Sequence, residues 1–292
     1  MGEPLRIGII GGSGLYDFPG LERLGERVVE TPYGPPSDAL VHARLPEAPG
    51  VELYFLPRHG RGHRHNPSEV PYRANIWALK SLGVSWVVSV SAVGSLRAYI
   101  IPGHVVVVDQ FIDRTRGRPQ SFFEKGIVAH VAFGDPVCPV LRGILLDAAR
   151  AAGATAHDGG TYLCMEGPAF STKAESRLHR SWGCDVVGMT NLPEAKLARE
   201  AELAYATLAF STDFDAWHDA HDAVTVEQVI AVLHANVALA QRIVREAIPR
   251  IAANTAASPA HHALTNAIMT DRTRIPEDAR ARLAPLLARV LA

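Results

Sequence analysis

Short apolar runs and amphipathic segments alternate along most of the chain. Continuous apolar runs at 5–10, 51–56, 84–90, 104–109, 186–188 and 203–211 predict β-strands, several of them buried on both faces. Apolar residues recur at helical spacing over 72–82, 140–152, 192–201 and 224–251, which predicts helices. Thr225, with Gln228 three residues further on, marks the expected start of the last helix. This order predicts an α/β fold, with a mixed or mostly parallel sheet between two layers of helices.

The pattern also predicts how the chain is divided. With 292 residues, 48% of them hydrophobic, the chain is long enough for one large core. No Pro/Gly/Ser-rich linker interrupts residues 1–252, so we expect one domain there. The tail over 253–292 is rich in alanine, and we expect a short helix over 276–291. The pattern assigns no role to this tail.

Charge and composition exclude several classes of protein. The net charge is -1 and no basic tract stands out, which argues against nucleic acid as a partner. Polar residues follow Met1 and no apolar run approaches the length of a membrane span, so we expect neither a secretory signal nor a membrane segment. Cys138, Cys164 and Cys184 lie far apart in the sequence, which predicts reduced, buried thiols in a cytoplasmic protein.

A glycine-rich loop follows the first apolar run. Gly11, Gly12 and Gly14 allow positive φ and a close approach of the backbone to a ligand. Successive N–H groups in such a turn can hold an anion, and Ser13 adds a hydroxyl. The loop matches neither the dinucleotide nor the Walker fingerprint. A phosphate-binding loop and a plain glycine turn both remain open.

A basic loop over 57–65 follows the strand predicted at 51–56. It holds Arg58, His59 and four further basic or imidazole side chains. An arginine offers a bidentate fork and a histidine a further donor, which favours an anion subsite. His63 and His65 raise the possibility of zinc, but the spacing fits no known motif and no acidic or thiol ligand accompanies them. A solvated basic loop is the other alternative.

Small and polar residues follow two more predicted strands. The hydroxyl of Ser91 and the N–H of Ala92 are candidate phosphate donors, although a small-residue turn explains them equally well. The nucleophile elbow of serine hydrolases is absent. After the strand at 186–188, Met189 can line a sugar or base and Thr190 can donate to an oxyanion. Phe170 follows a Gly-Pro bend and is a candidate stacking partner for a planar ring.

Two carboxylates follow the strand at 203–211. Asp213 and Asp215 are two residues apart, so both fall on one face of a strand. A carboxylate pair can raise the pKa of one member, which then stays protonated and donates. This arrangement suits a heterocycle with an amino group and a ring nitrogen. Acids of a surface loop are the alternative.

These stretches together resemble the purine nucleoside phosphorylase family, and within it the methylthioadenosine phosphorylase branch. The resemblance covers about residues 5 to 250 and rests on ordered motifs: IGIIGGSGLYDF, PRHGRGHRHNPSEVPYRANIWALK, SVSAVGSLR, VDQFIDRT, RPQSFF, CMEGPAFSTKAES, VGMTNLPEA and STDFDAWH. It implies an α/β domain with a mixed, barrel-like central sheet flanked by helices. It also implies a homotrimer or a dimer of trimers.

The resemblance implies roles for individual residues. Phosphate-binding positions are matched by Ser13, Arg58, His59, Ser91, Ala92 and Thr190. Phe170 and Met189 match residues that pack on purine and ribose, and His130 matches one that a neighbouring subunit lends near the 5′ substituent. Asp213 and Asp215 match the catalytic acids that read N7 and the 6-amino group of adenine. Ser171 and Asp213 follow the adenine pattern, and Val226 and Val229 suit a 5′-methylthio group.

The implied reaction is phosphorolysis of S-methyl-5′-thioadenosine to adenine and 5-methylthioribose 1-phosphate, a step of purine and methionine salvage. Inorganic phosphate is a co-substrate, and neither a metal nor an organic cofactor is implied. Three alternatives remain open: a broader purine nucleoside phosphorylase acting on adenosine or inosine, a hydrolytic nucleosidase, and a nucleoside-binding module without turnover. The acid pair argues against the last, because a binder need not protonate N7.

Overall fold

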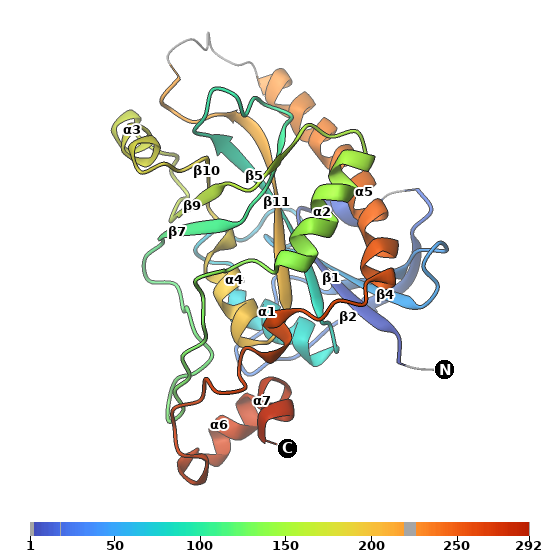
Figure 1. The fold of residues 1–292 in the computed structure, drawn as a ribbon, viewed down its shortest axis with the longest axis vertical. Coiled ribbons are helices and arrows are strands. Elements are labelled where there is room, and N and C mark those ends of the chain that lie inside the picture. Colours follow the sequence, from blue (N-terminus) through green and yellow to red (C-terminus); the bar gives the residue numbers. More distant parts are fainter. Residues whose placement is uncertain (1–2, 18, 219–225, 292) are drawn as a thin grey trace.

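The computed structural model describes residues 3–17, 19–218 and 226–291, and only the backbone of residues 13, 16, 226–231 and 233. A mixed sheet of 11 strands forms the centre, with helices on both faces (Figure 1). The strands are β1 (Leu5–Gly11), β2 (Glu22–Arg27), β3 (Leu40–Arg44), β4 (Val51–Pro57), β5 (Trp86–Ser95), β6 (Val105–Val107), β7 (Gln110–Arg114), β8 (Ala156–Asp158), β9 (Thr161–Met165), β10 (Val186–Gly188) and β11 (Ala204–Phe214).

The helices connect these strands or follow them. They are α1 (Tyr72–Ser81), α2 (Pro139–Ala151), α3 (Lys173–Ser181), α4 (Asn191–Glu200), α5 (Val226–Ala253), α6 (Glu277–Arg282) and α7 (Ala284–Leu291). Single 3₁₀ turns lie at Ser13–Tyr16, Pro259–His262 and Arg272–Arg274. The α/β prediction is therefore confirmed. No described helix is both long and apolar enough to cross a membrane.

The sheet branches at β5. One path runs β2-β3-β4-β1-β5-β10-β9-β7, and a second leaves β5 through β11 to β6 and β8. Strands β4, β1, β5 and β11 are parallel to one another. Their carboxyl ends consequently meet at one edge of the sheet, the usual place for a ligand in an α/β fold.

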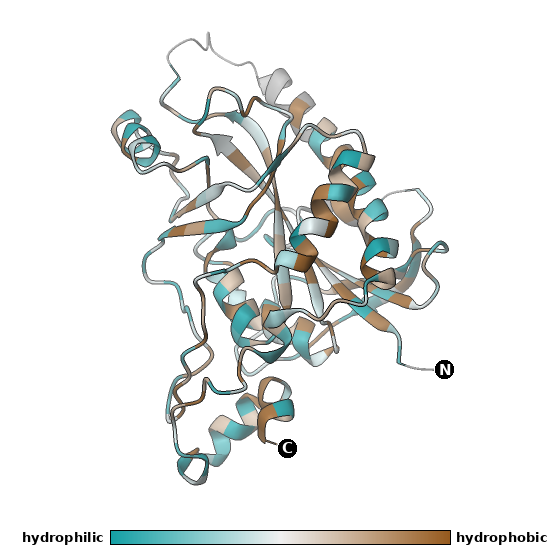
Figure 2. Ribbon diagram, viewed as in Figure 1, coloured by the Kyte–Doolittle hydropathy of each residue, from teal (hydrophilic) through white to brown (hydrophobic). Residues whose placement is uncertain are grey.

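Each face of the sheet has its own apolar layer. Helices α2 and α5 pack side by side on one face, and α1 and α4 cover the other (Figure 1). Figure 2 shows hydrophobic residues along the central strands, whereas α3 is mostly hydrophilic. The three cysteines are free and buried, as predicted.

The predicted helices and strands are confirmed within a few residues. Thr225, the expected cap of α5, lies outside the described residues. The pattern missed β2, β3, β7, β8, β9 and α3. Strand β2 is exposed at all six positions, so its sequence has no alternating apolar pattern that would predict a strand. Helix α3 buries only Ser176 and His179, but its capping box of Thr172 and Glu175 was a readable signal.

The tail packs onto the body of the protein. The expected helix over 276–291 is two short helices, α6 and α7. Leu264, Leu286 and Leu287 belong to the same buried cluster as α1 and α4. The indole Nε1 of Trp77, on α1, donates to the carbonyl of Arg282 at 3.0 Å.

Glu200, the last residue of α4, is a buried acid. It accepts from the Ser121 hydroxyl and the Phe122 backbone N–H, both at 2.7 Å. Burial raises the pKa of Glu200 from its ordinary value of 4.5 to about 7. The folded state therefore keeps a proton that the unfolded chain releases. Stability from this group is complete below about pH 4.5 and is lost as the pH rises through about 7.

We expect the Glu200→Gln variant to remove this pH dependence. Between pH 5 and pH 8 the wild-type free energy of unfolding should fall by about 2–3 kcal/mol relative to the variant. Urea denaturation of both proteins at several pH values measures the difference. Parallel stability profiles would contradict the assignment.

Candidate active site

A cavity of about 690 Å³ lies at the carboxyl edge of the parallel strands. Its volume is typical of pockets for small molecules. The structure brings together ten of the predicted site residues on its wall: Arg58, His59, Ser91, Ala92, Phe170, Ser171, Met189, Thr190, Asp213 and Asp215.

The remaining predicted residues are placed differently. His130 does not line this cavity; it lies on a segment whose backbone pairs with Ala267 in the tail. The side chains of Ser13, Val226 and Val229 are outside what the structure describes, so their predicted roles stay predictions.

The glycine loop borders the cavity through Gly11 and Gly12. None of Gly11, Gly12 and Gly14 has positive φ. The expectation that these glycines are needed for a left-handed backbone is therefore wrong. Close packing explains two of them: a Cβ on Gly11 would come within 2.3 Å of Leu15, and one on Gly14 within 2.8 Å of Val237. A Cβ on Gly12 would meet nothing within 4 Å.

Arg58 is buried beneath the cavity rather than held out to a ligand. Its Nε and Nη2 donate to the two carboxylate oxygens of Glu194 at 2.7 and 3.0 Å. Nη1 donates to the Val90 carbonyl at 2.9 Å, and Nη2 also donates to the Ser89 hydroxyl at 2.7 Å. Of its five N–H groups, one on Nη1 is left for a ligand. The expected open bidentate fork is therefore wrong.

His59 also differs from its expected role as a donor. Its Nδ1 lies 2.9 Å from the His65 carbonyl, which can only accept, so Nδ1 carries the proton. Burial, aided by the charge of Arg58, lowers the pKa of His59 to about 4. At neutral pH the imidazole is uncharged, and its Nε2 is a hydrogen-bond acceptor.

Two hydroxyls form a polar wall of the cavity. Ser91 Oγ, from β5, lies 3.3 Å from Thr190 Oγ1, which follows β10. Ser91 Oγ also lies 3.3 Å from the hydroxyl of Tyr162, behind this wall. The sequence separates Ser91 and Thr190 by 99 residues, and the β5–β10 pairing joins them.

Asp213 and Asp215 both line the cavity, as their spacing predicts. The pairing of β11 with β5 shifts register between Ser211 and Asp213, a bulge that re-aims the strand end. The side chain of Asp213 is exposed in the ligand-free chain. The buried carboxylate oxygen is instead Asp215 Oδ2, which has no hydrogen-bond partner in the structure.

The apolar wall comes from two adjacent segments. Phe170 is 82% exposed at the cavity, so it is presented from a loop and is not part of the core. Ser171 is buried beside it. A Cβ on Gly167, which has a φ of 66°, would come within 2.5 Å of Met189 Sδ, so the two segments touch here.

The rest of the basic loop is committed to other partners. Arg61 pairs with Glu26 and Asp38, and Arg64 Nη2 donates to the Ser37 carbonyl at 2.5 Å. In the part of the chain that the structure describes, no three His, Cys, Asp or Glu side chains gather in a way that could hold a metal ion.

Sequence reasoning missed several residues of the site. Glu194, 1% exposed, holds Arg58, and Asn236 and Val237 line the cavity from α5. Glu194 lies in the motif VGMTNLPEA, but no local signal marks it as buried, because α4 also holds Lys196, Arg199 and Glu200.

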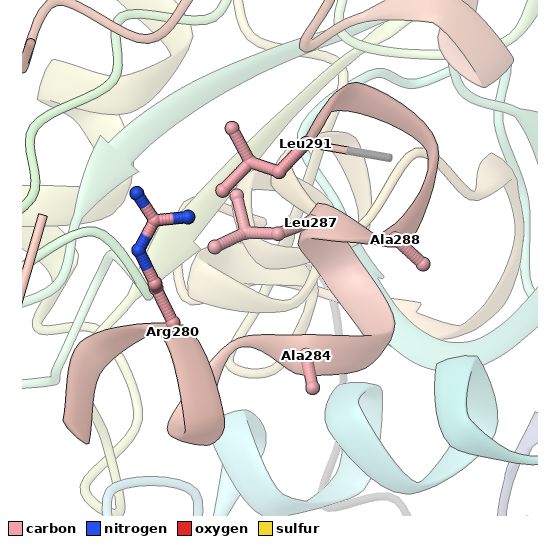
Figure 3. Close-up of a pocket in the computed structure, with 5 residues that line it drawn as sticks. All are labelled: Arg280, Ala284, Leu287, Ala288 and Leu291. Carbon is pink, nitrogen blue, oxygen red and sulfur yellow. The ribbon is translucent and has the colours of Figure 1, made fainter. Parts of the chain in front are cut away.

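A smaller hollow of about 240 Å³ lies between α6 and α7. Figure 3 shows that Arg280 is the one charged residue drawn on its wall, with Ala284, Leu287, Ala288 and Leu291. It lacks the hydroxyls and carboxylates of the larger cavity, which we therefore take as the active site.

The cavity thus joins two hydroxyls with two carboxylates at the edge of a mixed α/β sheet. A family model described as "Phosphorylase superfamily" matches residues 6–249. The chain therefore belongs to this superfamily. Among its relatives, the S-methyl-5'-thioadenosine phosphorylase of Chloroflexus aurantiacus is 60% identical over 97% of both chains. That of Geobacter sulfurreducens is 56% identical over 95% of this chain and 96% of its own.

Solved structures of similar proteins share the fold. A methylthioadenosine phosphorylase from an antarctic soil metagenomic library superposes with a TM-score of 0.92, at 49% identity over 98% of this chain and 100% of its own. A variant of the adenosine/methylthioadenosine phosphorylase of Schistosoma mansoni, in complex with methylthioadenosine, gives 0.80 at 36% identity over 97% and 98%.

Proposed function

We propose that this protein catalyses the phosphorolysis of S-methyl-5'-thioadenosine to adenine and 5-methylthioribose 1-phosphate. The observation that carries the proposal is one cavity that joins the Ser91 and Thr190 hydroxyls with the carboxylates of Asp213 and Asp215. The relatives from Chloroflexus and Geobacter, similar over nearly the whole chain, bear the name of this activity.

In the proposed reaction phosphate is the nucleophile. Ser91, Thr190 and the N–H groups near Gly12 and Ala92 hold it, and Arg58 contributes its one remaining N–H. A phosphate oxygen forms the bond to C1′ while the bond from C1′ to N9 breaks, and the electron pair of that bond passes to the purine. The phosphate dianion stabilises the positive charge that develops on the ribose.

The acids act on the leaving base. Asp213 gives a proton to N7 and so neutralises the departing purine. Because Asp213 is exposed in the ligand-free chain, we infer that the purine itself covers it on binding. Asp215, with its unpartnered Oδ2, accepts from the 6-amino group. Phe170 and Met189 pack on the base and sugar, and Val226 and Val229 surround the 5′-methylthio group.

The proposal also covers the oligomeric state, the cellular location and the pathway. We infer a homotrimer or a dimer of trimers in which His130 completes a neighbour's site near the 5′ substituent. Two exposed apolar side chains near His130 support this. Val128, two residues before it, is 47% exposed, and Met269, whose backbone N–H donates to the Val128 carbonyl, is 66% exposed. We further propose a cytoplasmic enzyme of purine and methionine salvage that uses no metal or organic cofactor.

One assay tests the reaction class. Base release is followed from S-methyl-5'-thioadenosine, adenosine and inosine, each with and without phosphate. We expect adenine release only when phosphate is present, and fastest from the methylthio substrate. Release without phosphate would indicate a nucleosidase, and no release from any substrate would indicate a binding module.

The Ser91→Ala variant tests the proposed role of Ser91 in phosphate binding. A hydrogen bond to a charged group contributes about 1.5–3 kcal/mol, so the phosphate KM should rise about 10- to 100-fold. The nucleoside KM should stay within about twofold, because in the proposed reaction Ser91 contacts phosphate and the two acids contact the base. Steady-state kinetics with each substrate varied in turn measures both. A rise confined to the nucleoside KM would overturn the assignment.

A further inference from the structure

Arg118 is a buried arginine that the proposed chemistry does not use. It lies in the segment after β7, and its side chain is 1% exposed. It is not among the residues that line the cavity, so it does not reach a ligand directly. A buried guanidinium must satisfy its N–H groups within the protein, and its partners show what it holds.

The guanidinium joins three segments of the chain. Its Nη1 donates to the carbonyls of Met189 and Leu192, each at 2.8 Å, and lies 3.2 Å from the Tyr72 hydroxyl. Its Nη2 donates to the Glu166 carbonyl at 2.5 Å. Nε lies 3.3 Å from the Glu166 carboxylate.

Two of these segments form adjacent parts of the active-site wall. The carbonyls of Met189 and Leu192 flank Thr190 and Asn191, so the guanidinium fixes both ends of the turn that presents Thr190. Glu166 begins the segment that leads through Gly167 to Phe170 and Ser171. Because both segments bond to one rigid, planar group, their separation is fixed.

We propose that Arg118 is a positioning residue for the active site, acting through the backbone of Met189 and Glu166. The inference rests on the proposed function. Arginine suits the task because its planar fork holds several oxygens in a fixed geometry, whereas lysine offers a compact charge on a flexible stem. Misplacement of reacting groups by about 1 Å can lower a rate about 100-fold, so a support outside the cavity has a measurable effect.

The test compares Arg118→Met and Arg118→Lys with a matched control. Arg199 also donates to two backbone carbonyls, those of Ala132 and Asp135 at 2.7 and 2.6 Å, but it does not line the cavity. Arg199→Met therefore removes a structural arginine that also holds two backbone carbonyls but is less buried than Arg118. For each protein the melting temperature, kcat and both KM values are measured well below the melting temperature.

We expect Arg118→Met to lower kcat about 10- to 100-fold in folded protein. Arg118→Lys should recover part of the loss, and Arg199→Met should keep kcat within twofold of wild type. If Arg118→Met does not fold, the lysine variant carries the comparison. A kcat unchanged in the folded Arg118 variants, or an equal loss in Arg199→Met, would overturn the proposal.

The two proposals fail in distinguishable ways. If the wild-type protein shows no phosphate-dependent release of base, the proposed function is refuted. Calorimetric titration with adenine then replaces kcat as the readout: binding about 10-fold weaker in Arg118→Met than in Arg199→Met supports the positioning role. Equal affinities of these two variants refute it.

Discussion

Replacement of Asp213 by asparagine is expected to lower kcat by about 10²- to 10⁴-fold, the usual contribution of a general acid. Asparagine keeps the shape of the side chain and its place beside Gly94, but it cannot give a proton to N7. The phosphate KM should change little, because Ser91 and Thr190 are untouched. An amide can instead donate to a 6-oxo group, so the preference should move toward inosine.

Steady-state kinetics on S-methyl-5'-thioadenosine and inosine measures both effects. Asp215→Asn is the matched control: it removes the same charge from the same cavity, and it should raise the nucleoside KM without creating inosine activity. Adenine release by Asp213→Asn at the wild-type rate would refute the proposed role at N7.

Replacement of Glu194 by glutamine is expected to lower the free energy of unfolding by about 3–5 kcal/mol, the usual effect of breaking a buried ion pair. The side chains of Arg58 and Glu194 are 3% and 2% exposed, so the variant leaves a buried, unpaired cation. Glu194 also accepts from the hydroxyls of Ser89 and Tyr205, both at 2.8 Å, and the amide cannot replace a carboxylate to all these donors.

Urea denaturation and thermal melting measure this loss. Glu22→Gln is the control, because the Arg44–Glu22 pair has a similar geometry but lies at the surface, with side chains 47% and 48% exposed. Its melting temperature should hardly move, since exposed ion pairs contribute little. Similar melting temperatures for both variants would contradict a structural role of the buried pair.

The sequence was informative wherever function concentrates residues in a short stretch. The motifs around Arg58 and Asp213 lie at the ends of β4 and β11, and the parallel strands bring these ends to one edge, whereas β10, which precedes Thr190, runs antiparallel to β5. Long-range pairing was not readable: Glu194 lies 136 residues from Arg58, and no local pattern connects them. The role of Arg58 was misjudged for this reason.

The extent of burial at the ends of strands was also not predictable from the sequence. An apolar run predicts that its own residues are buried, but it does not tell where burial stops. The bulge between Ser211 and Asp213 leaves Asp213 exposed and buries an oxygen of Asp215. A pattern of period two contains no signal for an extra residue in the ladder.

The long pairing of β5 with β11 has a consequence for the choice of substrate. The register from Ala204↔Trp86 to Phe214↔Ser95 places Ser91 and Asp213 on one hydrogen-bonded ladder, and the N–H of Asp215 donates to the Ser95 carbonyl at its end, at 3.0 Å. A paired ladder does not stretch, so in the proposed reaction it would fix the distance between phosphate and the base. A nucleoside lengthened by one methylene between base and sugar should occupy the cavity yet hold its C1′ out of reach of phosphate, and so act as an inhibitor without turnover.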